Sequence, residues 1–338
     1  MSSSPSAIQT AFAQAHPNIA LIKYWGKTAD LKYNEPAVAS LSITLDTLLT
    51  ETRVRFDPSL SGDEFVLNGQ LDIKKGTRIS ASIDVMRKLA NITTHCRIES
   101  SNNFPTGAGL ASSASGFAAL VGACDRALQL NLSLTQQSML ARSMSGSAAR
   151  SIYGGFAKIS LADSSSSSDP IFGRSTAEPI LPAEHWPLEV CVGVVSEKEK
   201  AIGSTEGMER SRLTSPYYDA WLAGNDQDII DAEVMVRARD FAKLAEISEF
   251  SCLKMHALAM ASQPGMLYWA GATVDAMHRI RALRSEGVPV FFTIDAGPQI
   301  KAICEPGYGD QVAQALADVH GVQRVIRCGL GPGVRASD

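Results

Sequence analysis

The segment most informative about the fold is Asn102-Asn103-Phe104-Pro105-Thr106-Gly107-Ala108-Gly109-Leu110-Ala111-Ser112-Ser113-Ala114-Ser115-Gly116. Gly107 and Gly109 allow backbone amides to approach a ligand closely. After Ser112 or Ser113, apolar residues recur on one helical face, so a helix should begin there and direct its unpaired N–H groups and positive dipole end at the loop. This arrangement favours a phosphate. The alternative is a structural turn before a helix, and the segment fits neither GxxxxGK[ST] nor GxGxxG.

The residues around this loop predict alternating strands and helices. Strands are expected at 40–48, 50–56, 96–100, 156–160, 190–195 and 288–294, and helices at 79–90, 134–143, 226–249 and 271–285. Ser133 and Gln136 fit a capping box at the start of the second of these helices. Five consecutive serines at 164–168 indicate an exposed loop. The pattern predicts an α+β protein with two domains, residues 1–185 and 186–338.

Composition excludes several classes of function. The 338 residues contain 31 Lys and Arg against 35 Asp and Glu, a net charge of −4, which provides no basic footprint for nucleic acid or an anionic membrane. No apolar run is long enough to span a bilayer, and the N-terminus shows no export signal. The six cysteines and six histidines lack metal-ligand spacing. We therefore expect buried, free thiols, a reducing compartment and no metal site built by the protein alone.

A second small-residue loop, Ser145-Gly146-Ser147, precedes Arg150 by about one helical turn. Hydroxyls and exposed amides at a helix start suit a second anionic group, and the Arg150 guanidinium can pair with a carboxylate or phosphate through two parallel hydrogen bonds. The alternative is an ordinary capped helix with a surface arginine.

Two further segments carry charged residues beside strand ends. Asn18-Ile19-Ala20-Leu21-Ile22-Lys23-Tyr24-Trp25-Gly26-Lys27 places two lysines and a tyrosine where they can contact a carboxylate or phosphates. Thr293-Ile294-Asp295-Ala296-Gly297-Pro298 ends an apolar strand with an acid that can serve as a base facing a cleft. Taken separately, such residues are more often solvated lysines and an aspartate in a turn.

Together these segments resemble the GHMP kinase superfamily and, within it, the mevalonate diphosphate decarboxylases. The resemblance lies in residues 18–27, 40–46, 102–116, 145–156 and 293–298, with weaker similarity at 196–198, 203–208 and 214–216. It implies the GHMP kinase fold, with an N-terminal domain like ribosomal protein S5 domain 2 and a C-terminal ferredoxin-like α+β domain. It also implies a cytoplasmic homodimer.

The resemblance implies an ATP-dependent decarboxylation of (R)-5-diphosphomevalonate to isopentenyl diphosphate, CO2, ADP and phosphate, with Mg2+ accompanying the ATP. Asp295 would be the base for the 3-hydroxyl, Lys23 would neutralise charge beside it, Arg150 would hold the C1 carboxylate, and Asn18 would order the site. The substrate diphosphate would contact Tyr24, Lys27, Ser145, Gly146 and Ser147. The ATP phosphates would contact Gly107, Ala108, Gly109, Ser112 and Ser113.

The sequence also departs from the better-known family members. Thr28-Ala29-Asp30 stands where they have a basic–acidic pair, and Ala37-Val38-Ala39-Ser40 where they have Asn-Ser-Ser. Two alternatives stay open within the superfamily: a decarboxylase of mevalonate 5-phosphate, and a 3-kinase that stops after phosphoryl transfer. A catalytically silent small-molecule binding protein on the same fold is a third.

Overall fold

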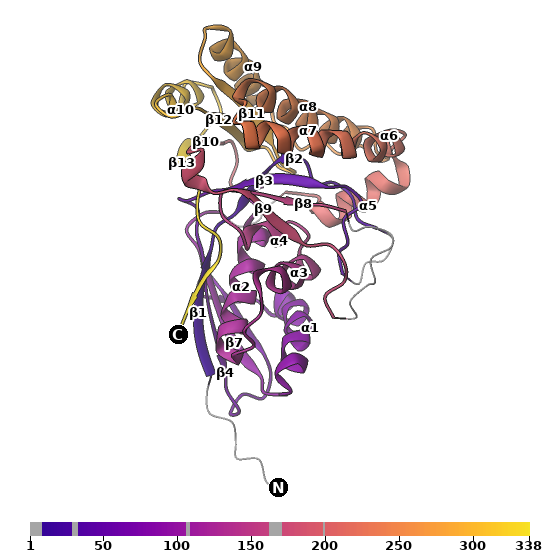
Figure 1. The fold of residues 1–338 in the computed structure, drawn as a ribbon, viewed down its shortest axis with the longest axis vertical. Coiled ribbons are helices and arrows are strands. Elements are labelled where there is room, and N and C mark those ends of the chain that lie inside the picture. Colours follow the sequence, from indigo (N-terminus) through magenta and orange to yellow (C-terminus); the bar gives the residue numbers. More distant parts are fainter. Residues whose placement is uncertain (1–8, 29–32, 106–108, 162–170, 199) are drawn as a thin grey trace.

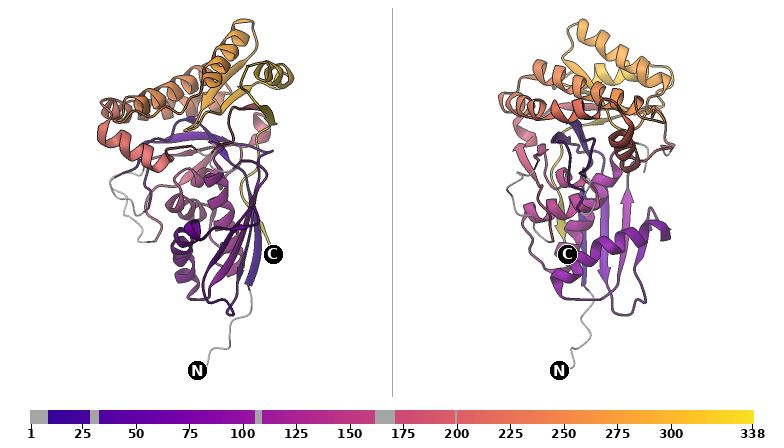
Figure 2. Two further views of the ribbon diagram at one scale, coloured as in Figure 1. Left: turned by 180° about the vertical axis from the view of Figure 1, so that it is seen from behind. Right: turned by 90° about the vertical axis from the view of Figure 1, so that its right-hand side faces the viewer.

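The computed structural model describes residues 9–28, 33–105, 109–161, 171–198 and 200–338. Three sheets form successive layers along the long axis of the molecule (Figure 1), and the same layering is seen from behind and from the side (Figure 2). The described part of the chain does not include several residues that the sequence analysis singled out. These are the serine run at 164–168, residues 29 and 30, and Gly107 and Ala108 of the glycine-rich loop.

The first layer is a six-stranded sheet with the strand order β14-β1-β4-β7-β5-β6. Its central strand β4 buries Thr50, Thr52, Val54 and Phe56 and turns the intervening residues outward, as the alternating sequence predicts. The strands of this sheet are β1 Gln9–Ala15, β4 Thr50–Phe56, β5 Glu64–Leu67, β6 Gln70–Leu71, β7 Cys96–Asn102 and β14 Arg335–Ser337.

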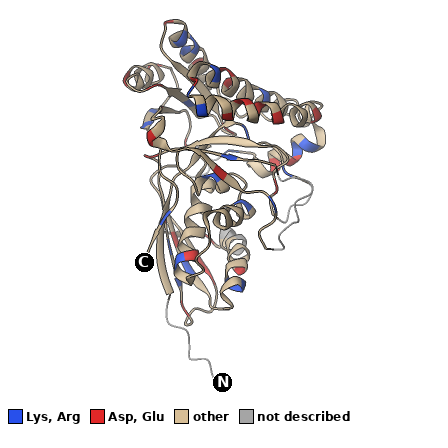
Figure 3. Cartoon of the chain, in the orientation of Figure 1, with Lys and Arg blue, Asp and Glu red and all other residues tan. Residues whose placement is uncertain are grey.

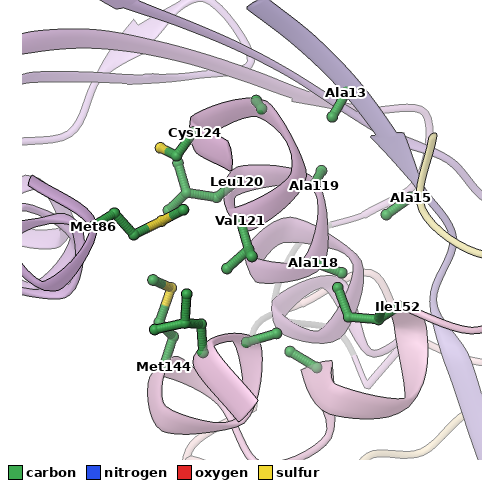
Figure 4. Close-up of a cluster of buried hydrophobic side chains, with 14 of the residues drawn as sticks. Ala13, Ala15, Met86, Ala118, Ala119, Leu120, Val121, Cys124, Met144 and Ile152 are labelled. Carbon is green, nitrogen blue, oxygen red and sulfur yellow. The ribbon is translucent and has the colours of Figure 1, made fainter. Parts of the chain in front are cut away.

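Helices α1 Ile73–Ala90 and α2 Ser112–Leu128 contact this sheet, and α3 Leu134–Met144 and the single turn α4 Ala148–Ser151 pack on α2. Small residues let α2 approach β1 and β4 closely. Figure 4 shows Ala118 and Ala119 on the side of this helix that faces Ala13 and Ala15 of β1, while Val121 points toward Met86 of α1 and Met144 of α3.

The second layer is a four-stranded sheet with the order β2-β3-β8-β9. Every residue of β2 and β3 is buried, because helices α7 and α8 contact these strands from one side and α4 contacts β3 and β8 from the other. The strands are β2 Asn18–Ile22, β3 Ser40–Thr44, β8 Phe156–Ile159 and β9 Ala177–Leu181.

The third layer is an antiparallel sheet with the order β11-β12-β10-β13, flanked by helices. The chain order β10, helices, β11, β12, α10, β13 is that of a ferredoxin-like split βαβ unit, which confirms the predicted C-terminal architecture. The elements are η1 Ala183–His185, β10 Glu189–Val194, α5 Ser204–Thr214, α6 Tyr218–Ala223, α7 Asn225–Ala238, α8 Phe241–Met260, α9 Gly271–Ser285, β11 Val290–Ile294, β12 Ile300–Cys304, α10 Gly309–Ala317 and β13 Arg324–Cys328.

Most predicted elements are confirmed, although several differ in their limits; the helix expected from residue 79, for example, begins at Ile73. The expected helix over 226–249 is two helices, since Arg239 takes a left-handed conformation and the Asp240 side chain accepts a hydrogen bond from the Lys243 amide to start α8. The strand expected to reach residue 48 ends at Thr44. Beyond it Leu45 pairs with Leu330, and Asp46 accepts a hydrogen bond from the Gly329 amide, so the chain bends away from β3.

Two other expectations can be compared with the structure. All six cysteines are buried and free, as their scattered positions predict. The capping box at Ser133 and Gln136 is formed in both directions.

The last strand, β14, returns to pair with β1, so residues near both ends of the chain share the first sheet. Across the described residues, each helix is too short or too polar to cross a bilayer.

Candidate active site

A cavity of about 690 Å³ opens where the three layers meet. It collects residues from the end of β2, the start of α2, the turn between α3 and α4, the start of α5 and the loop after β11. The residues that line it are Asn18, Ala20, Lys23, Tyr24, Trp25, Lys27, Gly109, Ala111, Ser112, Ser113, Phe117, Ser145, Gly146, Ser147, Arg150, Lys200, Ala201, Gly203, Ser204, Thr205, Met208, Met255, Asp295 and Ala296. Every described residue that the sequence analysis assigned to the site therefore faces one cavity.

Residues 105–113 are here called the phosphate loop, and its described part from Gly109 leads into α2 at Ser112 as predicted. Ala111 precedes the helix with φ 55°, and its methyl side chain cannot cap the first-turn amides. Gly109 has φ +83°, and a Cβ at this position would lie 3.0 Å from the Gly297 Cα. Glycine is therefore required here both for its backbone conformation and for the close approach of the loop after β11.

The second loop, Ser145–Ser147, ends α3 and precedes α4. A Cβ at Gly146 would lie 2.1 Å from the Tyr24 hydroxyl oxygen, so only glycine admits the phenol at this position. The Tyr24 hydroxyl is buried and has no hydrogen-bond partner among the described residues, and burial raises its pKa. An unpartnered hydroxyl in a cavity wall is suited to donating a hydrogen bond to a bound anion.

Arg150 lies in α4 with its side chain almost completely buried, at 1% exposure. Its Nε donates to Ser42 Oγ at 2.9 Å, Nη2 donates to Asn18 Oδ1 at 3.2 Å, and Nη1 donates to Ser40 Oγ. Burial lowers the pKa of Arg150 to about 10, which still leaves it protonated at neutral pH. Within the described part of the chain, no carboxylate forms an ion pair with this guanidinium, so its charge is available to an anionic ligand.

Asn18 orders this region from the end of β2. Its Nδ2 donates to the Ser147 carbonyl at 2.9 Å and to Ser151 Oγ at 2.8 Å, while its Oδ1 accepts from Arg150. One amide thus links the serine loop, α4 and the guanidinium. This geometry agrees with the ordering role that the resemblance implies.

Asp295 lies directly after β11 and faces two ammonium groups. Its Oδ1 is 2.7 Å from Lys23 Nζ, and its Oδ2 is 3.1 Å from Lys301 Nζ. Burial by itself would raise the pKa of Asp295, but the charges of Lys23 and Lys301 outweigh burial and hold that pKa well below its usual range. Asp295 is therefore a carboxylate at any working pH, and both lysines are buried beside it.

Lys27 is held at the other end of the cavity. Its Nζ donates to Asn34 Oδ1 at 2.7 Å and to Thr205 Oγ1 at 3.2 Å, next to the start of α5. Lys200 donates to Ser204 Oγ at 2.8 Å and to the Ala296 carbonyl at 3.1 Å. The ammonium groups of Lys27 and Lys200 and the first turn of α5 add positive potential to this end of the cavity.

Sequence reasoning gave no site role to several polar residues, among them Lys301, Lys200, Ser204 and Thr205. Lys301 left a signal, because it interrupts the apolar run Ile300–Cys304, in which every residue is buried. The other three belong to a segment whose link to the cavity depends on tertiary structure. The structure describes only one of the two segments in which the sequence departs from the better-known family members, residues 37–40, in full. Residues 29 and 30 are outside the described chain, whereas Ser40 contacts Arg150. The Ala39 amide donates to Asn225 Oδ1, and Asn225 Nδ2 donates to the Ala39 carbonyl.

The charges elsewhere are mixed. Lys and Arg alternate with Asp and Glu over the helices in Figure 3. The described residues contain no group of three His, Cys, Asp or Glu side chains able to hold a metal ion. The concentration of cations in the cavity, facing Asp295, is therefore a local feature suited to polyanionic ligands.

Comparison with known proteins gives consistent results. The family model for the diphosphomevalonate decarboxylase-like N-terminal domain matches residues 15–169, and that for the mevalonate 5-diphosphate decarboxylase C-terminal domain matches residues 190–329. A diphosphomevalonate decarboxylase of Candida albicans is 33% identical over 356 residues, which cover 96% of this chain and 97% of the relative.

Two solved structures extend the comparison to the fold. Mevalonate diphosphate decarboxylase from Staphylococcus aureus superposes with a TM-score of 0.91 at 38% identity, covering 98% of this chain and 99% of that one. The protein designated MDDEF, in complex with MVAPP, AMPPCP and magnesium, superposes with a TM-score of 0.89 at 39% identity, covering 98% of this chain and 100% of that one.

Proposed function

The chain belongs to the diphosphomevalonate decarboxylase family, and from that premise we propose which residues carry out its ATP-dependent reaction. The reaction converts (R)-5-diphosphomevalonate to isopentenyl diphosphate, CO2, ADP and phosphate. The observation that carries the assignment of roles is that one cavity contains both the Asp295–Lys23 pair and a buried Arg150 whose hydrogen-bond partners are neutral.

The phosphate loop and the Ser145–Ser147 loop each bind the phosphates of one ligand. The phosphate loop, with Gly107, Ala108, Gly109, Ser112 and Ser113, binds the ATP phosphates at the start of α2. The substrate diphosphate binds Tyr24, Lys27, Ser145, Gly146 and Ser147, where the buried phenol hydroxyl and the Lys27 ammonium supply donors. This division places the ATP γ-phosphate between the two loops, near Asp295.

The adenine base has a place beside the phosphate loop. A smaller cavity of about 110 Å³ shares Ser112, Ser113 and Phe117 with the larger one. Its remaining lining is Thr52, Phe65, Leu67, Ile79, Ile98, Ser100, Asn102, Gly116 and Leu120, a mostly apolar set with a few polar edges. A flat heterocycle suits such a lining.

Mg2+ accompanies ATP in this reaction, and MDDEF is described with magnesium bound. The described residues fit an ion that is carried mainly by phosphate oxygens. Asp295 is already engaged by two lysines, while the Ser112 and Ser113 hydroxyls offer neutral oxygen ligands beside the nucleotide site. When bound, the ion neutralises charge on the transferring phosphoryl group.

The first chemical step transfers the γ-phosphoryl group to the 3-hydroxyl. Asp295 accepts the hydroxyl hydrogen bond and orients the oxygen for in-line attack, and Lys23 neutralises charge between the carboxylate and the phosphoryl group. Because the pKa of Asp295 is low, it takes the proton only as the O–P bond forms and the hydroxyl becomes acidic. Positioning therefore contributes more than basicity.

The second step breaks two single bonds and forms two double bonds, one in the alkene and one in CO2, where a carboxylate oxygen supplies the electron pair. The C3–O bond breaks as phosphate leaves, the C1–C2 bond breaks as CO2 leaves, and the electron pair of the latter forms the C2=C3 double bond. Arg150 holds the C1 carboxylate until its electrons are released, and Asn18, Ser40 and Ser42 hold the guanidinium in place.

A direct assay tests this function. The purified chain, with ATP and Mg2+, is given mevalonate, its 5-phosphate or its 5-diphosphate, and CO2 and ADP are measured. We expect both products in equal amounts with the 5-diphosphate. Turnover confined to the 5-phosphate would select the other decarboxylase, ADP without CO2 would select a 3-kinase, and no turnover with any of the three would indicate a silent binding protein.

The family resemblance also supports a homodimer in the cytoplasm and a domain boundary near residue 185. Light scattering that gives about twice the 36.0 kDa chain mass would agree with the dimer, and a value near the chain mass would contradict it. Cell fractionation tests the location. The boundary is supported by the third sheet, whose first strand begins at Glu189, although β14 lies in the first sheet.

A further inference from the structure

Lys301 is the second ammonium group at the Asp295 carboxylate. It lies in β12, directly opposite Thr293 of β11 and Val192 of β10, and its side chain is completely buried. Its Nζ is 3.1 Å from Asp295 Oδ2 and 2.9 Å from the carbonyl oxygen of Gly109. A single ammonium group thus contacts both the catalytic carboxylate and the phosphate loop.

Stability alone does not account for this lysine. Burial disfavours the ammonium form and lowers the pKa of Lys301, and Asp295 already has Lys23 at 2.7 Å as a counterion. A buried ion pair contributes little net stability compared with apolar residues of similar volume, and a second cation on one carboxylate contributes less. An apolar residue at this position in β12 would match its neighbours Ile300 and Ala302.

The geometry around Gly109 gives Lys301 a different role. Gly109 packs so closely on the loop after β11 that a Cβ would lie 3.0 Å from the Gly297 Cα and 3.5 Å from the Ala296 carbonyl oxygen. That loop is itself tight, because the Gly297 amide donates to the Asp295 carbonyl at 2.7 Å. Lys301 contacts both segments that meet here, since it donates to the Gly109 carbonyl and pairs with Asp295 at the start of the loop after β11.

We propose that Lys301 is a positioning residue that ties the nucleotide-binding phosphate loop to the catalytic carboxylate. On the proposed function, this link holds the ATP γ-phosphate and Asp295 at a fixed separation, so that the substrate hydroxyl fits between them. Lys301 is not among the described residues that line the cavity, so we expect it to touch neither substrate directly. It acts on nucleotide affinity through Gly109 and on turnover through Asp295.

The test substitutes Lys301→Met, which keeps the length and removes the charge and the donor. Lys158→Met is the matched control, since Lys158 is also a strand lysine ion-paired with two carboxylates, Glu178 and Glu233, away from the cavity. For each protein the dissociation constant of Mg-ADP is measured by calorimetry, and kcat and both KM values are measured with 5-diphosphomevalonate. Lys301→Gln is measured in the same way, so that the result does not depend on one variant folding.

We expect Lys301→Met to weaken Mg-ADP binding about tenfold and to lower kcat by at least as much, because a hydrogen bond to a charged donor is lost on each side. The KM for the mevalonate substrate should stay within about twofold, and Lys158→Met should change none of these values. Unchanged Mg-ADP affinity, or a rise in the KM for the mevalonate substrate instead, would overturn the proposal.

A double-mutant cycle separates the two contacts. In an Asp295→Asn background, the additional Lys301→Met substitution should barely lower kcat further, since Lys301 acts on turnover through Asp295. The same substitution should still weaken Mg-ADP binding. Additive effects on kcat would contradict the link. Mg-ADP binding is measured without turnover, so it tests Lys301 even if the wild-type chain releases no CO2.

Discussion

Two buried arginines on consecutive helices have opposite surroundings. Arg142 in α3 is 0% exposed and pairs with the Glu35 carboxylate at 2.8 Å, while also donating to the carbonyls of Tyr33 and Phe172. Arg150 in α4 is 1% exposed and has only amide and hydroxyl partners among the described residues. The fold therefore neutralises one guanidinium internally and leaves the charge of the other uncompensated.

On the proposed function, this difference separates a structural cation from one that binds the substrate carboxylate. Arg142 and Glu35 join the segment around Tyr33 to the segment around Arg174, whose backbone amide also donates to Glu35. Arg150 carries the desolvation cost of its charge without a carboxylate in ion-pair contact among the described residues, and on the proposed function an anionic ligand recovers part of that cost on binding. Burial together with the absence of an internal counterion is thus a more specific sign of an anion site than burial alone.

The largest expected effect on turnover comes from removing the counterion of Lys23 and Lys301, so that these lysines, like Arg150, have no carboxylate in contact. Asp295→Ala removes the carboxylate that faces Lys23 and Lys301, and we expect kcat to fall about 10⁴-fold because the hydroxyl loses its orienting acceptor. Mg-ADP should bind at least as tightly as before, because the cavity becomes more positive. Steady-state kinetics and calorimetry measure the two quantities. A variant that retains a tenth of wild-type turnover would remove Asp295 from this role.

A slightly smaller loss is expected when the guanidinium of Arg150 is replaced by an ammonium. Arg150→Lys keeps the charge but loses the planar pair of donors, so kcat/KM should fall about 10³-fold. Arg142→Lys is the matched control. It keeps a charge next to Glu35 and should leave kcat/KM within about threefold, since Arg142 does not line the cavity. An equal fall in kcat/KM for Arg150→Lys and Arg142→Lys would contradict the assignment of different roles to these arginines.

When the charge of Arg142 or of Arg150 is removed completely, we expect the opposite order of effects: the loss at Arg142 should lower the free energy of unfolding more than the loss at Arg150. Arg142→Met leaves the Glu35 carboxylate without its cation, and we expect the free energy of unfolding to fall by about 3 kcal/mol. Arg150→Met removes a charge that has no internal counterion and should leave the free energy of unfolding unchanged or raise it. Urea unfolding of both variants checks this, and greater destabilisation by Arg150→Met would show that Arg150 is a structural residue.

The smallest effects concern the hydroxyls of the phosphate loop. Ser112→Ala and Ser113→Ala each remove one neutral oxygen at the start of α2, and the backbone amides remain in place. The KM for ATP should rise about fivefold, which corresponds to one neutral hydrogen bond, while the KM for 5-diphosphomevalonate stays the same. A defect confined to the mevalonate substrate would contradict the assignment of this loop to the nucleotide.

The features of the fold that depend on local sequence chemistry were predicted correctly. The helix after the glycine-rich loop begins at Ser112, the capping box fixes the start of α3, and the alternating residues of β4 fix its buried face. These features depend on neighbouring residues and on the geometry of a single element. The roles of Asp295 and Arg150 came from resemblance to the family and stay predictions until variants are measured.

The remaining features depend on contacts between distant segments. Lys301 meets Asp295 and Gly109 only after β12 pairs with β11 and the phosphate loop packs on Gly297. The Arg142–Glu35 pair joins residues that neither spacing nor periodicity connects. The return of β14 to β1 is likewise invisible in the local pattern. Local sequence rules therefore located the two loops, whereas the internal counterions became evident only in the folded chain.

The most direct test of the account is a crystal structure of the chain with 5-diphosphomevalonate, AMPPCP and Mg2+. The account predicts the C1 carboxylate on the Arg150 guanidinium, with N–O distances of about 2.7 to 2.9 Å, and the 3-hydroxyl between Asp295 and the terminal phosphate of the nucleotide. A carboxylate bound by another cation, with Arg150 still contacting only Asn18, Ser40 and Ser42, would contradict it.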